Sequence, residues 1–138
     1  MKDTLRPGLE YTLDFLVPKT KTVPCLYPES IRFQEMPDVF ATGFMVGFIE
    51  WACMEALAPH LDPNERTVGT MINVTHEAAT PVGMKVSAHV RCTAVAGRKI
   101  SWEVEARDEV DVIGRGQHER FVIDLEKFTK RLAAKQGS

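Results

Sequence analysis

The sequence has few cysteines, no strong excess of charge and no apolar run long enough to cross a membrane. Its three cysteines, Cys25, Cys53 and Cys92, lack C-x-x-C spacing, which argues against a disulfide framework and against a zinc site. A formal net charge of −2 gives no basic field for nucleic acid or anionic membranes. The apolar run 39–54 is shorter than the ~20 residues of a span, and the first residues lack the apolar stretch of a signal peptide. We therefore expect a reduced, cytoplasmic protein that uses no metal and has neither nucleic acid nor membrane as a partner.

What is present suits one globular domain over residues 1–138. The chain is 44% hydrophobic and 26% charged, an ordinary globular composition. A domain of this size buries roughly 68–70% of the surface that its unfolded chain exposes. Such a core needs neither disulfides nor a metal for stability.

The hydrophobic periodicity changes along the chain from strand to helix and back to strand. It predicts a first strand at 10–17, an irregular lid at 27–37, a buried helix at about 39–57 that Pro59 ends, and strands at 67–75, 84–95, 99–106 and 111–124. Residues 79–83 and 96–98 are interpreted as the turns between the first three strands of that run. In strand 84–95 the expected buried face is Val86, Ala88, Val90 and Cys92, and the expected solvated face is Lys85, Ser87, His89 and Arg91. Leu125, Phe128 and Leu132 share one face of a C-terminal helix.

One helix that is apolar nearly all round needs cover on most sides, and a curved antiparallel sheet can supply it. The fold class is therefore α+β, and the order of elements fits a hotdog fold, in which the sheet wraps around the long helix. Such a sheet has exposed edges, so a homodimer is expected.

Glu50 is the only charge in the apolar run 39–54. A buried, unpaired carboxylate costs several kcal/mol unless it is paired or protonated, so this position points to a functional site. The alternative is a structural pair with a buried Arg or His. Gly43, Gly47 and Glu50 share one helix face, which suggests a close approach of backbone or ligand, or simple packing of the helix on the sheet.

Three other positions are candidates to join Glu50. Thr42 lies near the helix start, where its spacing favours an N-terminal cap, although a hydroxyl near a carboxylate and an imidazole can also serve as nucleophile or donor. His76 follows strand 67–75 and is the imidazole best placed to meet the helix, against the alternative of a solvated or structural histidine. Gly69 lies early in that strand, where a backbone N–H can stabilise an oxyanion.

The last strand carries Gly114, Gly116, His118 and Arg120 on one face. This pattern suits a narrow channel with positive charge at its mouth for a phosphate-bearing ligand, or a bulged strand with a solvated basic face. The Gly-x-Gly is not a dinucleotide fingerprint, because no strand-turn-helix follows it. The cations of the C-terminal tail are interpreted as a solvated helix face.

Several of these segments together resemble the fluoroacetyl-CoA thioesterase family and its hotdog relatives. They are Tyr27–Ser30, Val39–Gly47, Glu50–Cys53, Val74–His76, Ala79–Pro81 and Gly116–Arg120, in one register from about residue 8 to 128. The resemblance implies a catalytic set of Thr42, Glu50 and His76. It also implies that the backbone of Gly69 helps to hold the thioester carbonyl and that His118 and Arg120 lie near CoA.

The lid departs from that family at one position. Phe33 matches the first of two phenylalanines that cover the acyl tip, but Met36 stands at the second. Methionine is flexible where phenylalanine is rigid. The departure leaves thioesterase chemistry untouched and bears on fluorine selectivity.

The expected function is hydrolysis of a short-chain acyl-CoA thioester, with fluoroacetyl-CoA as a candidate and CoA as part of the substrate rather than a cofactor. The first alternative is a non-catalytic acyl-CoA binding or sensing module on the same fold, which would need no Thr-Glu-His set. The second is a hotdog hydratase, which uses an Asp/His pair near its helix start, where this sequence offers Thr42.

Overall fold

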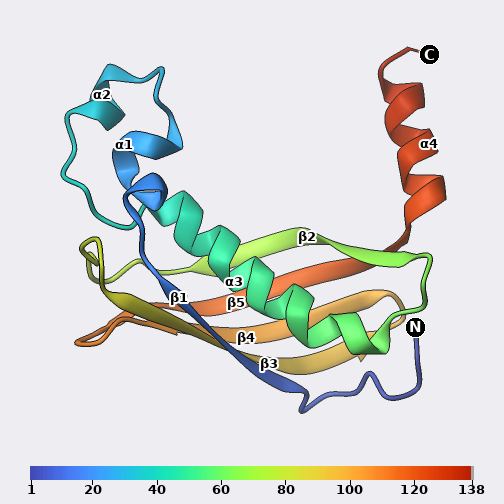
Figure 1. Cartoon of the computed structure of the whole chain (residues 1–138). Helices are drawn as coiled ribbons and strands as arrows, with labels where there is room; N and C mark the ends of the chain where they lie inside the picture. Colours follow the sequence, from blue (N-terminus) through green and yellow to red (C-terminus); the bar gives the residue numbers. More distant parts are fainter. Residues whose placement is uncertain (138) are drawn as a thin grey trace.

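The computed structural model describes residues 1–137 as one curved antiparallel sheet that wraps around a long helix (Figure 1). The strands are β1 (Glu10–Leu16), β2 (Glu65–Val74), β3 (Lys85–Ala96), β4 (Lys99–Arg107) and β5 (Val112–Asp124). The long helix is α3 (Thr42–Leu57), followed by the short 3-10 turn η2 (Ala58–His60). This is the hotdog architecture that the sequence predicts.

Helix α3 is the centre of the hydrophobic core. Its buried side chains are Met45, Phe48, Ile49, Ala52, Cys53, Ala56 and Leu57, and they pack with inward-facing residues of the sheet that include Val90, Trp102 and Val122. Removing such side chains from water stabilises the fold by about 1.5–3 kcal/mol for each large one. The helix begins three residues later than predicted, because Val39 and Phe40 form bridges to Pro81 and Thr22 instead of a helical turn.

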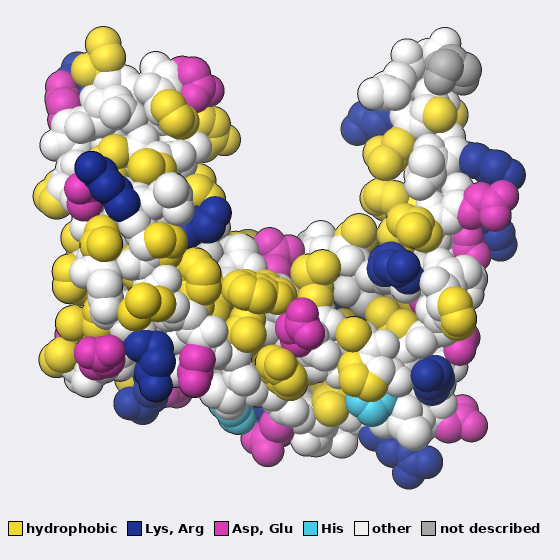
Figure 2. Space-filling model, viewed as in Figure 1, with side chains coloured by type: hydrophobic (Ala, Val, Ile, Leu, Met, Phe, Trp, Pro, Cys, Tyr) yellow, Lys and Arg dark blue, Asp and Glu magenta, His cyan; other side chains and the backbone are white. Residues whose placement is uncertain are grey.

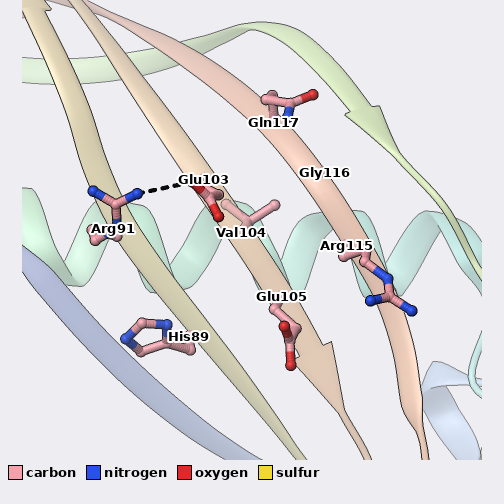
Figure 3. A pocket seen from close by; sticks show the side chains of 8 residues that line it. All are labelled: His89, Arg91, Glu103, Val104, Glu105, Arg115, Gly116 and Gln117. Atoms are coloured by element: carbon pink, nitrogen blue, oxygen red, sulfur yellow. Dashed lines mark hydrogen bonds and ion pairs between the residues drawn. The ribbon is translucent and has the colours of Figure 1, made fainter.

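The alternation predicted for strand β3 is confirmed. Val86, Ala88, Val90 and Cys92 are fully buried, whereas His89 and Arg91 lie on the opposite face. There they line a polar hollow of about 380 Å³ with side chains of β4 and β5, and Figure 3 shows these side chains in front of the sheet with the helix behind it. Arg91 donates a 2.9 Å hydrogen bond to Glu103 across that face.

The strand order is β1-β3-β4-β5-β2. The turn at 96–98 joins neighbouring strands β3 and β4 as predicted, and residues 79–83 lie between β2 and β3 as predicted, but these two strands are not neighbours in the sheet. Strand β2 pairs with β5, so the chain after β2 crosses the sheet to reach β3. This crossover carries His76 past the start of α3.

Two arms rise from opposite ends of the sheet, with β2 running between their bases (Figure 1). One arm contains the one-turn helices α1 (Val23–Leu26) and α2 (Ile31–Gln34), which follow the turn η1 (Lys19–Lys21). Its segment 27–37 is the predicted irregular lid. The other arm is helix α4 (Leu125–Lys135), which begins at the cap Asp124, whose side chain accepts from the Lys127 amide.

None of the helices within residues 1–137 has the length and hydrophobicity that a membrane span needs. The same residues hold no cluster of three or more His, Cys, Asp or Glu side chains arranged around a metal position.

Candidate active site

Thr42 and His76 meet at the first turn of α3. The Thr42 Oγ1 and the His76 Nδ1 lie 2.6 Å apart, a hydrogen bond between side chains 34 residues apart in sequence. The cap of α3 is Ala41, and Thr42 is the first helical residue. The interpretation of Thr42 as an N-terminal cap is therefore wrong, because its hydroxyl bonds to the imidazole instead of to a backbone amide.

Backbone hydrogen bonds fix the segment that carries His76. The amides of Thr75 and Glu77 donate to the carbonyls of Arg115 and Ile113 on β5, at 2.9 and 2.6 Å. Farther along, the Phe40 amide donates to the Thr80 carbonyl at 2.8 Å, which ties the crossover to the residues just before Thr42. His76 is thus held on both sides against the start of α3.

The glycines of β5 make this approach possible. Gly116 has a φ of +154°, and a Cβ built there would lie 1.9 Å from the Asn73 carbonyl oxygen. A Cβ on Gly114 would lie 2.5 Å from the Thr75 carbonyl oxygen. Close backbone packing at these glycines positions the end of β2 and hence His76. The alternative of a solvated basic face on this strand is wrong, because His118 and Arg120 are buried.

His76 is suited to accept a proton at neutral pH. Burial lowers the pKa of His76 below its ordinary value of 6.5, although a hydrogen bond to the backbone of Ala78 acts in the opposite direction. Its Nε2 is buried and has no hydrogen-bond partner within residues 1–137. In a neutral imidazole only one of the two ring nitrogens carries a proton, so the other is available to accept one.

Glu50 lies farther along α3 and pairs with Arg120 of β5. The Arg120 Nη1 donates to the Glu50 Oε2 at 3.0 Å, and the side chains are 3% and 37% exposed, respectively. The expectation of a deeply buried carboxylate is thus corrected, since the buried charge is the guanidinium. The hydrogen bond from Arg120 fixes where the Glu50 carboxylate points. Loss of either partner of such a pair would be strongly destabilising.

The sequence suggested that Arg120 lies at the mouth of a channel, but its side chain is buried. Its Nε and Nη2 donate to the side chain and the carbonyl of Thr67, both at 2.9 Å. Its Nη1 also lies 3.1 Å from His118 Nε2. These contacts leave Arg120 2% exposed, behind Glu50 and facing the core.

His118 completes this cluster as a neutral imidazole. Its Nδ1 lies 2.7 Å from the Met71 carbonyl oxygen, so Nδ1 carries the proton and Nε2 accepts from Arg120. Burial lowers the pKa of His118 further than the bond to Met71 raises it, and Arg120 also lowers it. His118 therefore supports Arg120 and is 2% exposed.

Gly69 allows the Glu50 carboxylate to reach β2. A Cβ at residue 69 would lie 2.6 Å from the Glu50 Oε2, so a larger residue would displace the carboxylate. Glu50, Gly69 and His118 line a pocket of about 240 Å³ together with Val46, Thr70, Met71 and Ile72. The space for a ligand beside Glu50 is thus bounded by the backbone of β2.

The two polar pairs stand apart within one chain. Thr42 and Glu50 are eight residues apart on α3, which is about 12 Å along the helix axis. The first pair lies beside the lid arm, and the second lies at the middle of β2. The structure therefore brings Thr42 to His76 and Glu50 to Gly69, His118 and Arg120, but it does not bring the two groups together within a single chain.

The lid lies beyond the start of α3. Phe33 packs against Tyr27 with ring centroids 5.5 Å apart, and Met36 is 49% exposed. Leu26 of α1 lies against Gly43, where an added Cβ would meet its Cδ2 at 2.8 Å. Gly43 thus leaves room for Leu26 of the lid arm, whereas a Cβ added at Gly47 would meet no atom within 4 Å.

Sequence reasoning missed Thr67 and the carbonyl of Met71, which hold Arg120 and His118. A signal for Arg120 was present, since a carboxylate in an apolar helix needs a cation and Arg120 shares an inward-facing strand face with Val122. The position of Thr67 depends on the β2–β5 register, in which Gly69 lies opposite Arg120.

The fold, one curved antiparallel sheet around a long helix, is that of the hotdog-fold thioesterases. A family model described as fluoroacetyl-CoA-specific thioesterase matches residues 26–126. A curated fluoroacetyl-CoA thioesterase from Streptantibioticus cattleyicolor is 56% identical over 135 residues, which cover 98% of this chain and 97% of the relative. The chain therefore belongs to the fluoroacetyl-CoA-specific thioesterase family, and it is an acyl-CoA thioester hydrolase.

Solved structures agree with this assignment. The fluoroacetyl-CoA thioesterase FlK superimposes with a TM-score of 0.94 at 55% identity, with 96% of this chain and 98% of that chain covered. A thioesterase superfamily member from Thermus thermophilus superimposes with a TM-score of 0.81 at 26% identity and covers 98% of both chains. The predicted resemblance is confirmed, and the interpretations as a non-catalytic module and as a hydratase are set aside.

Proposed function

We propose that this thioesterase hydrolyses fluoroacetyl-CoA to fluoroacetate and CoA, with Thr42, Glu50 and His76 as its catalytic residues. The observation that carries the proposal is the hydrogen bond between Thr42 and His76. Thr42 lies on α3, the helix that also holds Glu50. A hydroxyl bonded to a neutral imidazole, together with a carboxylate held by a buried arginine, supplies a donor, a base and a nucleophile or water activator. The chemistry requires no metal or redox cofactor.

The active site is proposed to form between two copies of the chain. The edge of β2 is free to pair with a second copy, and Ile72 exposes 42% of its side chain beside it. If two β2 edges pair antiparallel, the end of β2 in one chain, together with the His76 that follows it, approaches Gly69 of the other chain. Thr42 and His76 of one chain would then face Glu50 and Gly69 of the other. The dimer would thus bring together two groups that lie about 12 Å apart along α3 in one chain. The protein is accordingly proposed to be a homodimer.

In this site the thioester carbonyl lies against the Gly69 backbone, whose N–H stabilises the developing oxyanion. Glu50 attacks the carbonyl carbon or activates the water that does so. CoA leaves as the thiolate when the C–S bond breaks. The neutral His76 takes a proton from the hydrolytic water, which attacks the thioester or the acyl-Glu50 anhydride, and passes that proton to the thiolate, while Thr42 positions the carbonyl. Phe33 and Met36 cover the acyl tip, while His118 and Arg120 serve the site by holding Glu50. The three free cysteines suit a reducing cytoplasm, where acyl-CoA is present.

Release of free CoA from fluoroacetyl-, acetyl-, propionyl- and hexanoyl-CoA tests the substrate. We expect turnover of the two-carbon thioesters to exceed that of hexanoyl-CoA, because the lid closes over a short acyl group. We further expect preference for fluoroacetyl-CoA over acetyl-CoA, reduced by the flexible Met36 and increased in the Met36→Phe variant. Equal rates for all four substrates, or no CoA release from any, would contradict the proposal.

The pH dependence of kcat/KM tests the role of His76. The reaction needs the neutral imidazole, and burial lowers the pKa of His76 below 6.5. Activity should therefore be complete near pH 7 and fall as the pH drops through a value below 6.5. The control is His89→Gln, since His89 is half-exposed on the opposite face of the sheet and should leave the profile unchanged. An acidic limb with its midpoint above 6.5 would argue against His76 as the titrating group.

A further inference from the structure

Helix α4 has an apolar face that the rest of residues 1–137 covers only in part, where Phe128 borders a hollow beside Arg98 and the end of β5. Leu125, Phe128 and Leu132 share that face, Leu125 and Leu132 are 43% and 49% exposed, and none of the residues of α4 is buried. Figure 2 shows hydrophobic side chains along the wall of this arm that faces the hollow between the two arms. An isolated helix of this length is marginal in water, so α4 needs a surface to pack against.

The lid has exposed apolar side chains of the same kind. Tyr27, Ile31 and Met36 are 57%, 74% and 49% exposed. The lid and α4 cannot meet within one chain, because they rise from opposite ends of β2 (Figure 1), whose ten residues span about 33 Å.

The charges of the two arms are complementary. The lid, residues 27–37, carries Glu29 and Glu35 against Arg32, a formal charge of −1, and the acidic Asp38 follows it directly. Helix α4 carries Lys127, Lys130, Arg131 and Lys135 against Glu126, a formal charge of +3. Opposite charges around apolar centres favour this pairing over the pairing of α4 with a second α4, which would bring two positive surfaces together.

We propose that α4 of each chain docks on the lid of the partner copy and holds that lid over the partner's acyl pocket. The proposal rests on the homodimer of the proposed function. A two-fold axis through antiparallel β2 edges brings the Glu65 end of each β2 toward the Val74 end of the other. Since α4 stands at the Glu65 end and the lid at the Val74 end, each α4 meets the partner's lid. The same axis forms both the active sites and these two contacts.

Hydrogen exchange of the lid amides in the full-length protein tests this docking. The amides of Gln34, Glu35 and Met36 donate to carbonyls within the lid and report on its opening. We expect Leu132→Asp to accelerate their exchange on the order of tenfold, since a carboxylate replaces an apolar contact. The matched control is Ala134→Asp, which adds the same charge on the opposite side of α4 and should leave the lid amides unchanged.

Light scattering on each variant completes the test. Faster lid exchange in a dimeric Leu132→Asp protein supports the docking, as does loss of the dimer in Leu132→Asp but not in Ala134→Asp. Unchanged lid exchange in a dimeric Leu132→Asp protein overturns it and assigns α4 to another partner, such as a membrane surface or a different protein. A monomeric wild-type protein overturns both the docking and the proposed dimer, whereas a dimer that releases no CoA overturns the proposed function alone.

Discussion

The Glu50→Gln variant is expected to lose about 10²- to 10⁴-fold in kcat for CoA release, the usual contribution of a positioned acid–base group. The carboxylate pairs with Arg120 Nη1, and it lines the pocket beside Gly69. Glutamine keeps the shape of the side chain and an oxygen that accepts from Arg120, so the fold should remain intact. The measurement is CoA release under saturating substrate, together with a thermal melt.

The matched control for this variant is Glu55→Gln. Glu55 lies five residues later on α3 and accepts a 3.2 Å hydrogen bond from Trp51 Nε1 at the surface. Its replacement should change kcat less than about twofold, because a surface contact of this kind contributes little. Wild-type turnover in Glu50→Gln would remove Glu50 from the catalytic set.

The Arg120→Met variant is expected to lose about 3 kcal/mol of the free energy of unfolding, at the lower end of the cost of breaking a buried ion pair. Methionine fills a similar volume but leaves Glu50, His118 Nε2 and both oxygen atoms of Thr67 without their donor. The lower end applies because Glu50 is partly exposed and water can solvate it. Activity should fall as well, because Glu50 loses the group that orients it. Urea denaturation measures the free energy directly.

Arg115→Met is the control for Arg120→Met. Arg115 also lies on β5 and pairs with Glu77 at 2.9 Å, but its side chain is 59% exposed. An exposed ion pair contributes about 0–1 kcal/mol, so this variant should be nearly as stable as the wild type. If both variants lost the same amount of stability, Arg120 would have no special role in the core.

The elements of this fold follow from patterns that are local in sequence. The apolar run of α3 and the alternation of β3 each reflect burial of one element, and each was predicted within a few residues. The crossover after β2 was missed, because residues 79–83 have the composition of a turn whether they join neighbouring strands or span the sheet. Which strands pair depends on contacts between distant segments, and periodicity within one segment does not contain that information.

The same distinction holds in the site. Glu50 could be selected because a charge in an apolar run is costly wherever the helix lies. Thr42 was interpreted as a cap because capping is the common local role of threonine, whereas its actual partner, His76, is 34 residues away. Arg120 was expected at the mouth of a ligand channel or on a solvated basic face, because a cation beside strand glycines suits a phosphate-bearing ligand. Its burial required the β2–β5 register, which places it against Gly69 and Thr67. The resemblance to a family joined Thr42, Glu50 and His76 where local patterns could not.

The most direct test of the central claim, a site built from two chains, is to mix two inactive variants. Glu50→Gln and His76→Ala homodimers each lack one group at both sites. In a heterodimer of the two, one site loses both groups and the other site is intact. With random subunit exchange half of the dimers are heterodimers, so the mixture should recover about a quarter of the wild-type rate of CoA release from fluoroacetyl-CoA. A mixture that forms heterodimers, as native mass spectrometry would show, but stays as inactive as its parents would contradict the account.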